Sequence, residues 1–175
     1  MIRKAAIVSI SGTVLTKKET IIIKREKPWG IILFKRNILS KNQLITLTKS
    51  IKRIMKDKKY PILIDEEGGK VSRFSNFLDN SFFNQKYFGN LYKLNKKIGT
   101  KFYKTYVNSL SKILIKVGIN INTSPVLDLL KKNTHDVIGN RSYSTNPYIV
   151  NELGKLCIKF YKKNKIATVI KHIPG

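Results

Sequence analysis

Short apolar runs alternate with longer amphipathic stretches along the whole chain, and this alternation constrains the fold more than any other feature. The apolar runs are residues 5–10, 30–34, 61–65, 119–125 and 167–172. Runs of this length that are apolar throughout are typical of strands buried on both faces of a parallel sheet, and the amphipathic stretches are typical of covering helices. The sequence therefore predicts an α/β fold in which each strand is followed by a helix.

Capping and periodicity patterns predict four helices. Thr16 with Glu19, and Ser40 with Gln43, have the spacing of capping boxes, which places helix starts near residues 17 and 41. A long helix is expected over residues 98–117, where apolar residues recur at steps of three and four. Asn146 followed by proline predicts the N-cap and first residue of another helix. We expect all the apolar helix faces to pack in the core.

The 175 residues suffice for about one domain, and 42% hydrophobic content can bury a sizeable core. The lone cysteine, Cys157, cannot form an internal disulfide, and Cys and His do not occur at zinc-ligand spacing. We therefore expect a cytoplasmic protein with no structural metal and no cofactor. The apolar stretch 5–15 is interrupted by serine and glycine, so it predicts a buried first strand and not a signal peptide. No segment approaches the roughly 20 apolar residues of a membrane span, so no membrane partner is expected.

The chain is strongly basic, with 35 Lys and Arg against 10 Asp and Glu and a net charge of +25. Such a charge by itself points to nucleic acid or an anionic membrane. Only six of the cations are arginines, however, and the lysines are spread over almost every segment. Nucleic-acid sites favour arginine and interleaved aromatic residues, so we expect solvated lysine faces and no nucleic-acid partner. The competing hypothesis, a basic nucleic-acid-binding α/β protein, predicts an affinity for DNA or RNA that falls steeply with salt.

The longest irregular stretches are expected over residues 66–92 and 127–146, each after the carboxyl end of a strand. Ligands of parallel α/β folds bind at that edge of the sheet. The first stretch opens with acidic residues, a glycine pair that permits a sharp turn, and Arg73. A carboxylate there can accept from vicinal hydroxyl groups, and an arginine can donate to sugar oxygens. A solvated surface turn is the alternative explanation for any one of these acids.

Five segments, in order, resemble signature motifs of the bacterial β-N-acetylhexosaminidases of glycoside hydrolase family 3. They are residues 29–37 (WGIILFKRN), 64–74 (IDEEGGKVSRF), 118–128 (GININTSPVLD), 136–143 (DVIGNRSY) and 169–175 (VIKHIPG). A set of ordered motifs is far more specific than a single glycine-rich loop. The resemblance extends over most of the chain.

This resemblance implies a TIM-type (β/α)8 barrel, of which residues 1–175 form the N-terminal part of a single domain with about the first five βα units. It also implies a glycosidase that hydrolyses terminal non-reducing N-acetyl-β-D-glucosamine residues by a retaining mechanism, from peptidoglycan fragments in cell-wall recycling. By matching position, the sugar-binding residues are Asp65, Arg73, Arg141, Lys171 and His172. Their chemistry agrees, since a carboxylate accepts from ring hydroxyls, cations donate to them, and a histidine does either according to its tautomer.

Two positions depart from the motifs: Lys70 stands where the family has Arg, and Asn140 where it has Asp or Glu. Any ion pair at those positions is therefore in doubt. The family's acid/base histidine and aspartate nucleophile belong to motifs beyond Gly175, and the remaining acids Glu66, Glu67 and Asp128 are given no catalytic part.

We therefore expect no catalytic residue within 1–175 and no turnover by this chain alone. A non-catalytic sugar-binding protein or a decayed fragment is the alternative. A barrel cut after the fifth strand also exposes two sheet edges, which predicts self-association through them.

Overall fold

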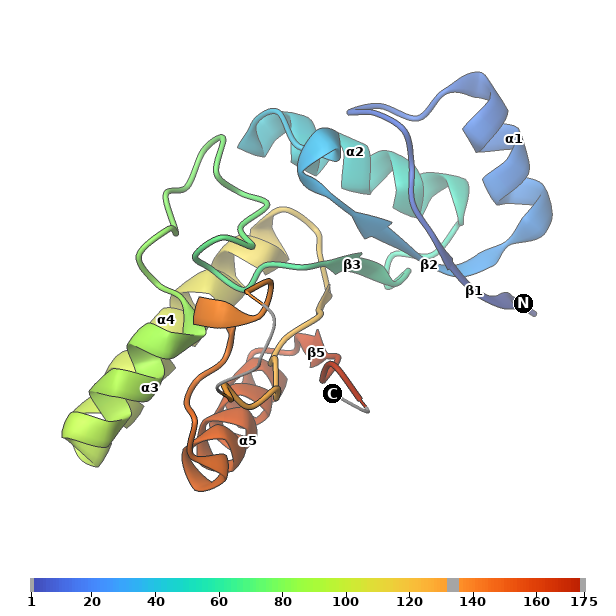
Figure 1. Ribbon diagram of the computed structural model, residues 1–175. Helices are drawn as coiled ribbons and strands as arrows, with labels where there is room; N and C mark the ends of the chain where they lie inside the picture. Colours follow the sequence, from blue (N-terminus) through green and yellow to red (C-terminus); the bar gives the residue numbers. More distant parts are fainter. Residues whose placement is uncertain (1, 132–135, 174–175) are drawn as a thin grey trace.

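The computed structural model describes residues 2–131 and 136–173, which fold around one parallel sheet (Figure 1). The sheet has five strands in the order β1-β2-β3-β4-β5. They are β1 (Lys4–Val8), β2 (Pro28–Leu33), β3 (Ile62–Ile64), β4 (Ile121–Asn122) and β5 (Ala167–Thr168). All five predicted strands are confirmed. The last two are shorter than their apolar runs, and beyond them the two chain segments meet again at an isolated bridge between Val126 and Lys171.

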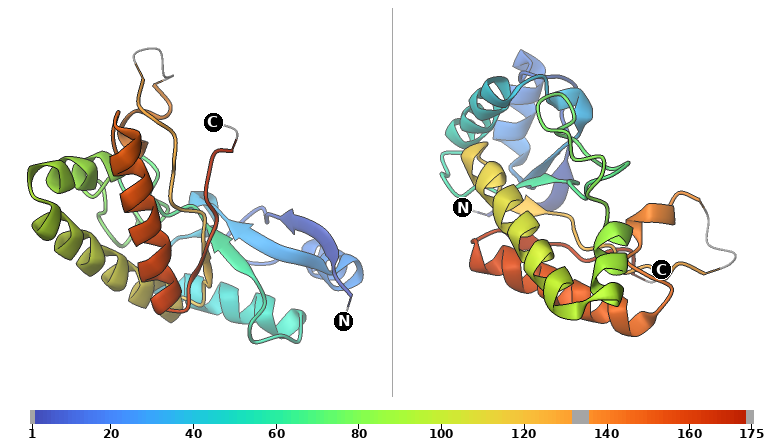
Figure 2. Two further views of the ribbon diagram at one scale, coloured as in Figure 1. Left: turned by 90° about the horizontal axis from the view of Figure 1, so that it is seen from below. Right: turned by 90° about the vertical axis from the view of Figure 1, so that its left-hand side faces the viewer.

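The helices follow one another around the sheet in chain order (Figure 1, Figure 2). They are α1 (Lys17–Glu26), α2 (Lys41–Ile54), α3 (Gln85–Leu94), α4 (Lys96–Lys116) and α5 (Pro147–Lys163), with short 3-10 helices at Lys35–Asn37 and Gly139–Arg141. Each crossover joins neighbouring strands in the same direction, so right-handed crossovers place the helices on one face, as in the first units of a TIM-type barrel. Within the described sheet, β1 and β5 each pair along one side only.

The helix starts predicted from capping are confirmed at α1, α2 and α5. Thr16 caps α1 and forms the reciprocal capping box with Glu19. Ser40 caps α2, but the side-chain oxygen of Gln43 accepts from the backbone N–H of Leu39, one residue before the expected donor. Asn146 caps α5, which begins with proline. These predictions hold because a cap depends on only a few neighbouring residues.

The stretch 66–92 is not irregular throughout, since it contains most of α3, and that expectation is wrong. Asn84 caps α3 by accepting from the N–H of Tyr87, and Asn95 caps α4 immediately afterwards. The two helices approach closely: a Cβ at Gly99 would lie 2.5 Å from the Tyr92 Cα. The asparagines suggest a loop locally, whereas here each one starts a helix that is held by tertiary packing.

The core lies between the sheet and the helices, and the side chains of Ile31, Leu33, Ile62 and Ile64 are fully buried there. β1 differs, and its predicted burial is wrong: its first four residues are exposed, and Ile7 is 48% exposed. β1 is an edge strand of the described sheet, with a partner on one side only. Among the described residues, no helix combines the length and the apolar character needed to cross a bilayer.

Candidate functional site

Four of the five predicted site residues meet in one set of ion pairs at the carboxyl edge of the sheet. Asp65 follows β3, Lys171 lies beyond β5, and Arg141 is in the 3-10 helix between β4 and α5. The Lys171 ammonium lies 3.0 Å from Asp65 Oδ1 and 2.6 Å from Glu67 Oε1. We call Asp65, Glu67, Arg73, Arg141 and Lys171 the edge network. It joins side chains up to 106 positions apart in the chain.

Asp65 is the carboxylate on the β3 side of the edge network. Its Oδ1 accepts from the Thr123 hydroxyl and from Lys171, and its Oδ2 lies 3.3 Å from Arg73 Nη2. Burial acts to raise the pKa of Asp65, but the Thr123 hydrogen bond and the two cations outweigh it and hold the pKa below its ordinary value of 3.8. Asp65 is therefore ionised at neutral pH and acts only as a hydrogen-bond acceptor.

Glu67 is the second carboxylate of the edge network, and the sequence analysis missed it. Besides Lys171, it accepts two hydrogen bonds from Arg141, from Nε at 2.8 Å and from Nη2 at 3.0 Å. Its side chain is only 1% exposed. The hydrogen bonds from Arg141 to Glu67 outweigh burial and raise the pKa of that arginine. In the sequence, Glu67 is visible only as the third of three consecutive acids before the glycine pair, and its partners lie far along the chain.

His172, the fifth predicted residue, lies outside the edge network. Its ring Nδ1 is 2.8 Å from Asp128 Oδ2, and its backbone N–H donates to the same oxygen. The His172 side chain is 44% exposed, against 11% for Asp128. A carboxylate at Nδ1 favours the tautomer with a proton there, which leaves Nε2 to accept a hydrogen bond. The structure therefore adds Asp128 as the partner that orients this ring.

Buried hydrogen bonds fix the loop that follows β3. The Glu66 carboxylate accepts from the backbone N–H of Arg73 at 2.7 Å and from Asn80 Nδ2 at 3.0 Å, and burial raises the pKa of this acid. The side chain of Asn122 bonds both the backbone N–H and the carbonyl of Glu66. Gly68 has φ +81°, and a Cβ there would lie 2.1 Å from a backbone oxygen, so the turn requires glycine. The loop thus holds its part of the edge network in one geometry.

The two departures from the family motifs leave the edge network intact. Lys70 makes no ion pair within the part of the chain that the structure describes. Asn140 lies beside Arg141, whose guanidinium is already paired with Glu67. The ion pairs that hold the site lie at Asp65 and Glu67.

The site offers fixed hydrogen-bond donors and acceptors. Asp65 and Glu67 are bonded to cations, and Asp128 is bonded to the His172 ring. Within residues 2–131 and 136–173, no group of three His, Cys, Asp or Glu side chains is arranged to hold a metal ion. Such an array of acceptors and donors suits a ligand rich in hydroxyl groups.

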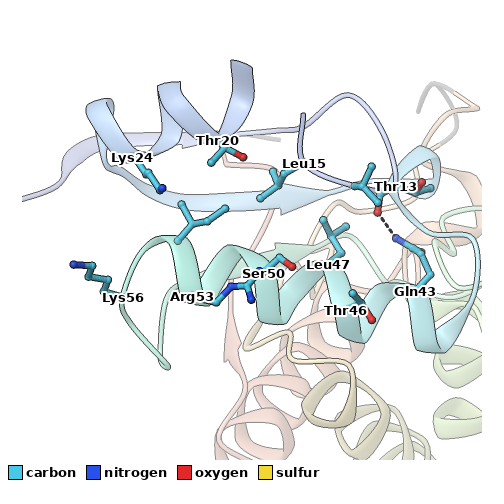
Figure 3. Close-up of a pocket in the computed structure, with 12 residues that line it drawn as sticks. Thr13, Leu15, Thr20, Lys24, Gln43, Thr46, Leu47, Ser50, Arg53 and Lys56 are labelled. Carbon is cyan, nitrogen blue, oxygen red and sulfur yellow. Dashed lines mark hydrogen bonds between the residues drawn. The ribbon is translucent and has the colours of Figure 1, made fainter. Parts of the chain in front are cut away.

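A separate cleft of about 630 Å³ lies between α1 and α2 (Figure 3). Figure 3 shows Thr20 and Lys24 of α1 across from Ser50 and Arg53 of α2. Lys24 and Arg53 are in the last turns of their helices, where positive charge offsets the helix dipole. The cleft shares no residue with the edge network, and its cations are explained by the helix ends, so we place the site at the sheet edge.

The family model that matches this chain is that of glycosyl hydrolase family 3, and two relatives with similar sequences are beta-hexosaminidases. Residues 5–175 match the glycosyl hydrolase family 3 N-terminal domain. Beta-hexosaminidase A of Pseudoalteromonas piscicida is 30% identical over 93% of this chain and 27% of its own length. The beta-hexosaminidase of Hydrogenovibrio crunogenus is 34% identical over 83% of this chain and 40% of its own length.

Solved structures agree with the curated relatives. NagZ from Neisseria gonorrhoeae, in complex with N-trifluoroacetyl-D-glucosamine, matches with a TM-score of 0.86 and 30% identity over 99% of this chain and 51% of that chain. The present chain therefore spans about half, or less, of the length of these relatives.

Proposed function

This chain belongs to glycosyl hydrolase family 3, and from that premise we propose that residues 1–175 form the sugar-binding part of a β-N-acetylhexosaminidase. The proposed reaction is hydrolysis of terminal non-reducing N-acetyl-β-D-glucosamine residues. The observation that carries this proposal is the edge network, because four residues matching the family's sugar-binding positions converge there. A structural neighbour in complex with an N-acylated glucosamine supports the choice of sugar.

Each residue has a distinct part in the proposed binding. Asp65 is ionised and already accepts hydrogen bonds from Thr123 and Lys171. In the proposed complex it also accepts hydrogen bonds from a pair of ring hydroxyls of the sugar. Arg73 and Arg141 donate to sugar oxygens through guanidinium N–H groups that the carboxylates do not use. Lys171, whose ammonium contacts Asp65, Glu67 and Thr123, donates to the sugar in place of Thr123. His172 offers Nε2 as an acceptor, with Asp128 holding its ring. Together these groups bind and orient the sugar.

The same groups are poorly suited to break the glycosidic bond. A retaining glycosidase requires a proton donor and a carboxylate nucleophile about 5–5.5 Å apart in the usual two-carboxylate case. Asp65, with a lowered pKa, is a weak proton donor at neutral pH, and Glu67 is bound by two cations. We therefore propose that residues 1–175 alone bind sugar without turnover and that the reacting groups come from elsewhere in the enzyme.

The source of the sugar and the cell compartment complete the proposal. Peptidoglycan fragments in cell-wall recycling are the proposed source, on the strength of the family resemblance. A cytoplasmic location is part of the proposal and rests on Cys157, the single cysteine of the sequence, which cannot form an internal disulfide.

Titration of N-acetylglucosamine into the 175-residue chain, followed by NMR, tests the binding site. We expect saturable binding by the wild type and loss of binding in Asp65→Asn, which replaces an ionised acceptor by an amide. Asp57→Asn is the matched control, because Asp57 also pairs with an arginine but precedes β3, at the opposite edge of the sheet. Equal binding by wild type and Asp65→Asn would refute the assignment. A chromogenic N-acetylglucosaminide tests turnover. Hydrolysis by residues 1–175 at an ordinary glycosidase rate would contradict the proposal that this part of the enzyme binds the sugar without cleaving it.

A further inference from the structure

The candidate site is balanced in charge although the chain as a whole carries +25. Apart from His172, the side chains that make up this balance are three carboxylates and three cations: Asp65, Glu67 and Asp128 with Arg73, Arg141 and Lys171. Asp128 belongs to the site because its carboxylate is hydrogen-bonded to the ring and the backbone N–H of His172, the residue after Lys171. The balance is a local property, since basic residues greatly outnumber acidic ones elsewhere.

Glu67 contributes most to this balance. It is the most deeply buried carboxylate of the edge network, with its side chain 1% exposed against 17% for Asp65. It also contacts two of the three cations, Arg141 through both oxygens and Lys171 at 2.6 Å. Because water is largely excluded around Glu67, its charge acts on these cations with little screening.

Neighbouring acids do not duplicate this effect. Glu66 is turned into the loop, where it accepts from backbone N–H groups and from Asn80. Asp128 is bonded to His172, so its oxygen is occupied there. Asp65 contacts Lys171 and Arg73 and makes no direct contact with Arg141 among the described bonds.

We propose that Glu67 is a buried counter-ion that makes this site select an uncharged sugar over a phosphorylated one. Arg141 and Lys171 without Glu67 would be a pair of partly buried cations beside the proposed hydroxyl-binding groups, which is an arrangement that binds phosphate. With Glu67 present, the Arg141 guanidinium keeps N–H groups for neutral oxygens, while Glu67 and Asp65 offset the charge of the two cations. This inference rests on the proposed function and adds a specificity residue to it, one that positions Arg141 and Lys171 and is not itself catalytic.

The test compares N-acetylglucosamine with N-acetylglucosamine 6-phosphate in wild type and Glu67→Gln. The amide keeps an oxygen acceptor and nearly the same shape but removes the charge. We expect the ratio of the two affinities to move toward the phosphate by about tenfold or more in Glu67→Gln. An unchanged ratio overturns the proposal.

Asp57→Asn is the matched control for charge. It raises the net charge of the chain by the same single unit but lies at the opposite edge of the sheet. Long-range attraction of the basic chain for an anion is therefore equal in the two variants. A phosphate gain of the same size in Asp57→Asn would show that net charge, and not Glu67, sets the preference.

A second measurement keeps this inference separate from the proposed function. Inorganic phosphate should raise the melting temperature of Glu67→Gln more than that of wild type or Asp57→Asn, even if no sugar binds to any of them. Sugar binding that fails in wild type, with this phosphate effect present, contradicts the proposed function alone.

If Glu67→Gln does not fold, Lys171→Met tests the charge balance of the site by removing a positive charge instead of a negative one. Removing Lys171 leaves an excess negative charge, so glucosamine, whose amine is largely protonated at neutral pH, should gain at that pH relative to N-acetylglucosamine. No such gain overturns the proposal as well.

Discussion

Glu67 and Glu26 are both carboxylates that contact two cations, yet they lie in very different surroundings. Glu67 is 1% exposed and contacts Arg141 and Lys171, each 15% exposed, at the carboxyl edge of the sheet. Glu26, at the end of α1, is 31% exposed and contacts Lys4 and Arg25, which are 65% and 71% exposed. The residue types are nearly the same, so the difference lies in burial.

This difference decides what each group of charges does. Exposed pairs exchange their contacts with water at little cost, so they contribute little to stability. A buried carboxylate between two cations cannot be removed without leaving charge in a poorly solvated place. The carboxyl edge is therefore a rigid, preorganised site, whereas the α1 end is an ordinary charged surface.

The largest effect is expected from Glu67→Ala. Arg141 and Lys171 would remain partly buried without their common counter-ion, so we expect the free energy of unfolding to fall by about 3–5 kcal/mol. Urea unfolding followed by circular dichroism measures this loss. A loss below about 1 kcal/mol, the range of exposed pairs, would show that the carboxyl edge is no different from the α1 end.

Asp65→Asn should show a pH-dependent loss of stability of about 1–3 kcal/mol at neutral pH. Because the pKa of Asp65 in the folded protein is below 3.8, its ionised form stabilises the fold above that value, and this contribution is lost as the pH falls through the folded pKa. The difference between wild type and Asp65→Asn should therefore shrink on acidification below about pH 4. Glu66→Gln is the control, since the pKa of Glu66 is raised and its difference should not shrink in this way.

Self-association tests the exposed edge of β1. The net charge of +25 opposes contact between chains at low salt, and added salt screens this repulsion, so light scattering should increase along a salt series. Ile7→Lys should suppress the increase by placing a charge on the exposed strand. Leu94→Lys, at an exposed position at the end of α3, should have no such effect. A wild type that is monomeric at every salt concentration contradicts this prediction.

The smallest effect is expected from Glu26→Ala. Its two cations are already solvated, so the urea midpoint should be the same as that of wild type within error. A measurable loss would mean that the α1 end is organised more like the carboxyl edge than its exposure indicates.

Most of the fold was predictable from local patterns. The strands and the starts of α1, α2 and α5 follow from apolar runs and caps, each of which involves a few consecutive residues. α3 was missed because its start at Asn84 suggests a loop and its packing against α4 is a tertiary contact. The exposure of β1 was missed because an apolar run predicts a strand but does not say what covers it.

In the candidate site, too, some features follow from the local sequence and others only from the tertiary structure. The sequence by itself determined that Asp65 and Arg73 share a glycine turn at the end of a strand, because such turns are local and parallel strands bring their carboxyl ends to one edge. Only the tertiary structure decided that Glu67 takes Arg141, 74 positions away, together with Lys171, and that His172 turns to Asp128 instead. The physical reason is burial: the strength and choice of an ion pair depend on how far water is excluded, and exclusion of water is a property of the packed fold and not of any short segment.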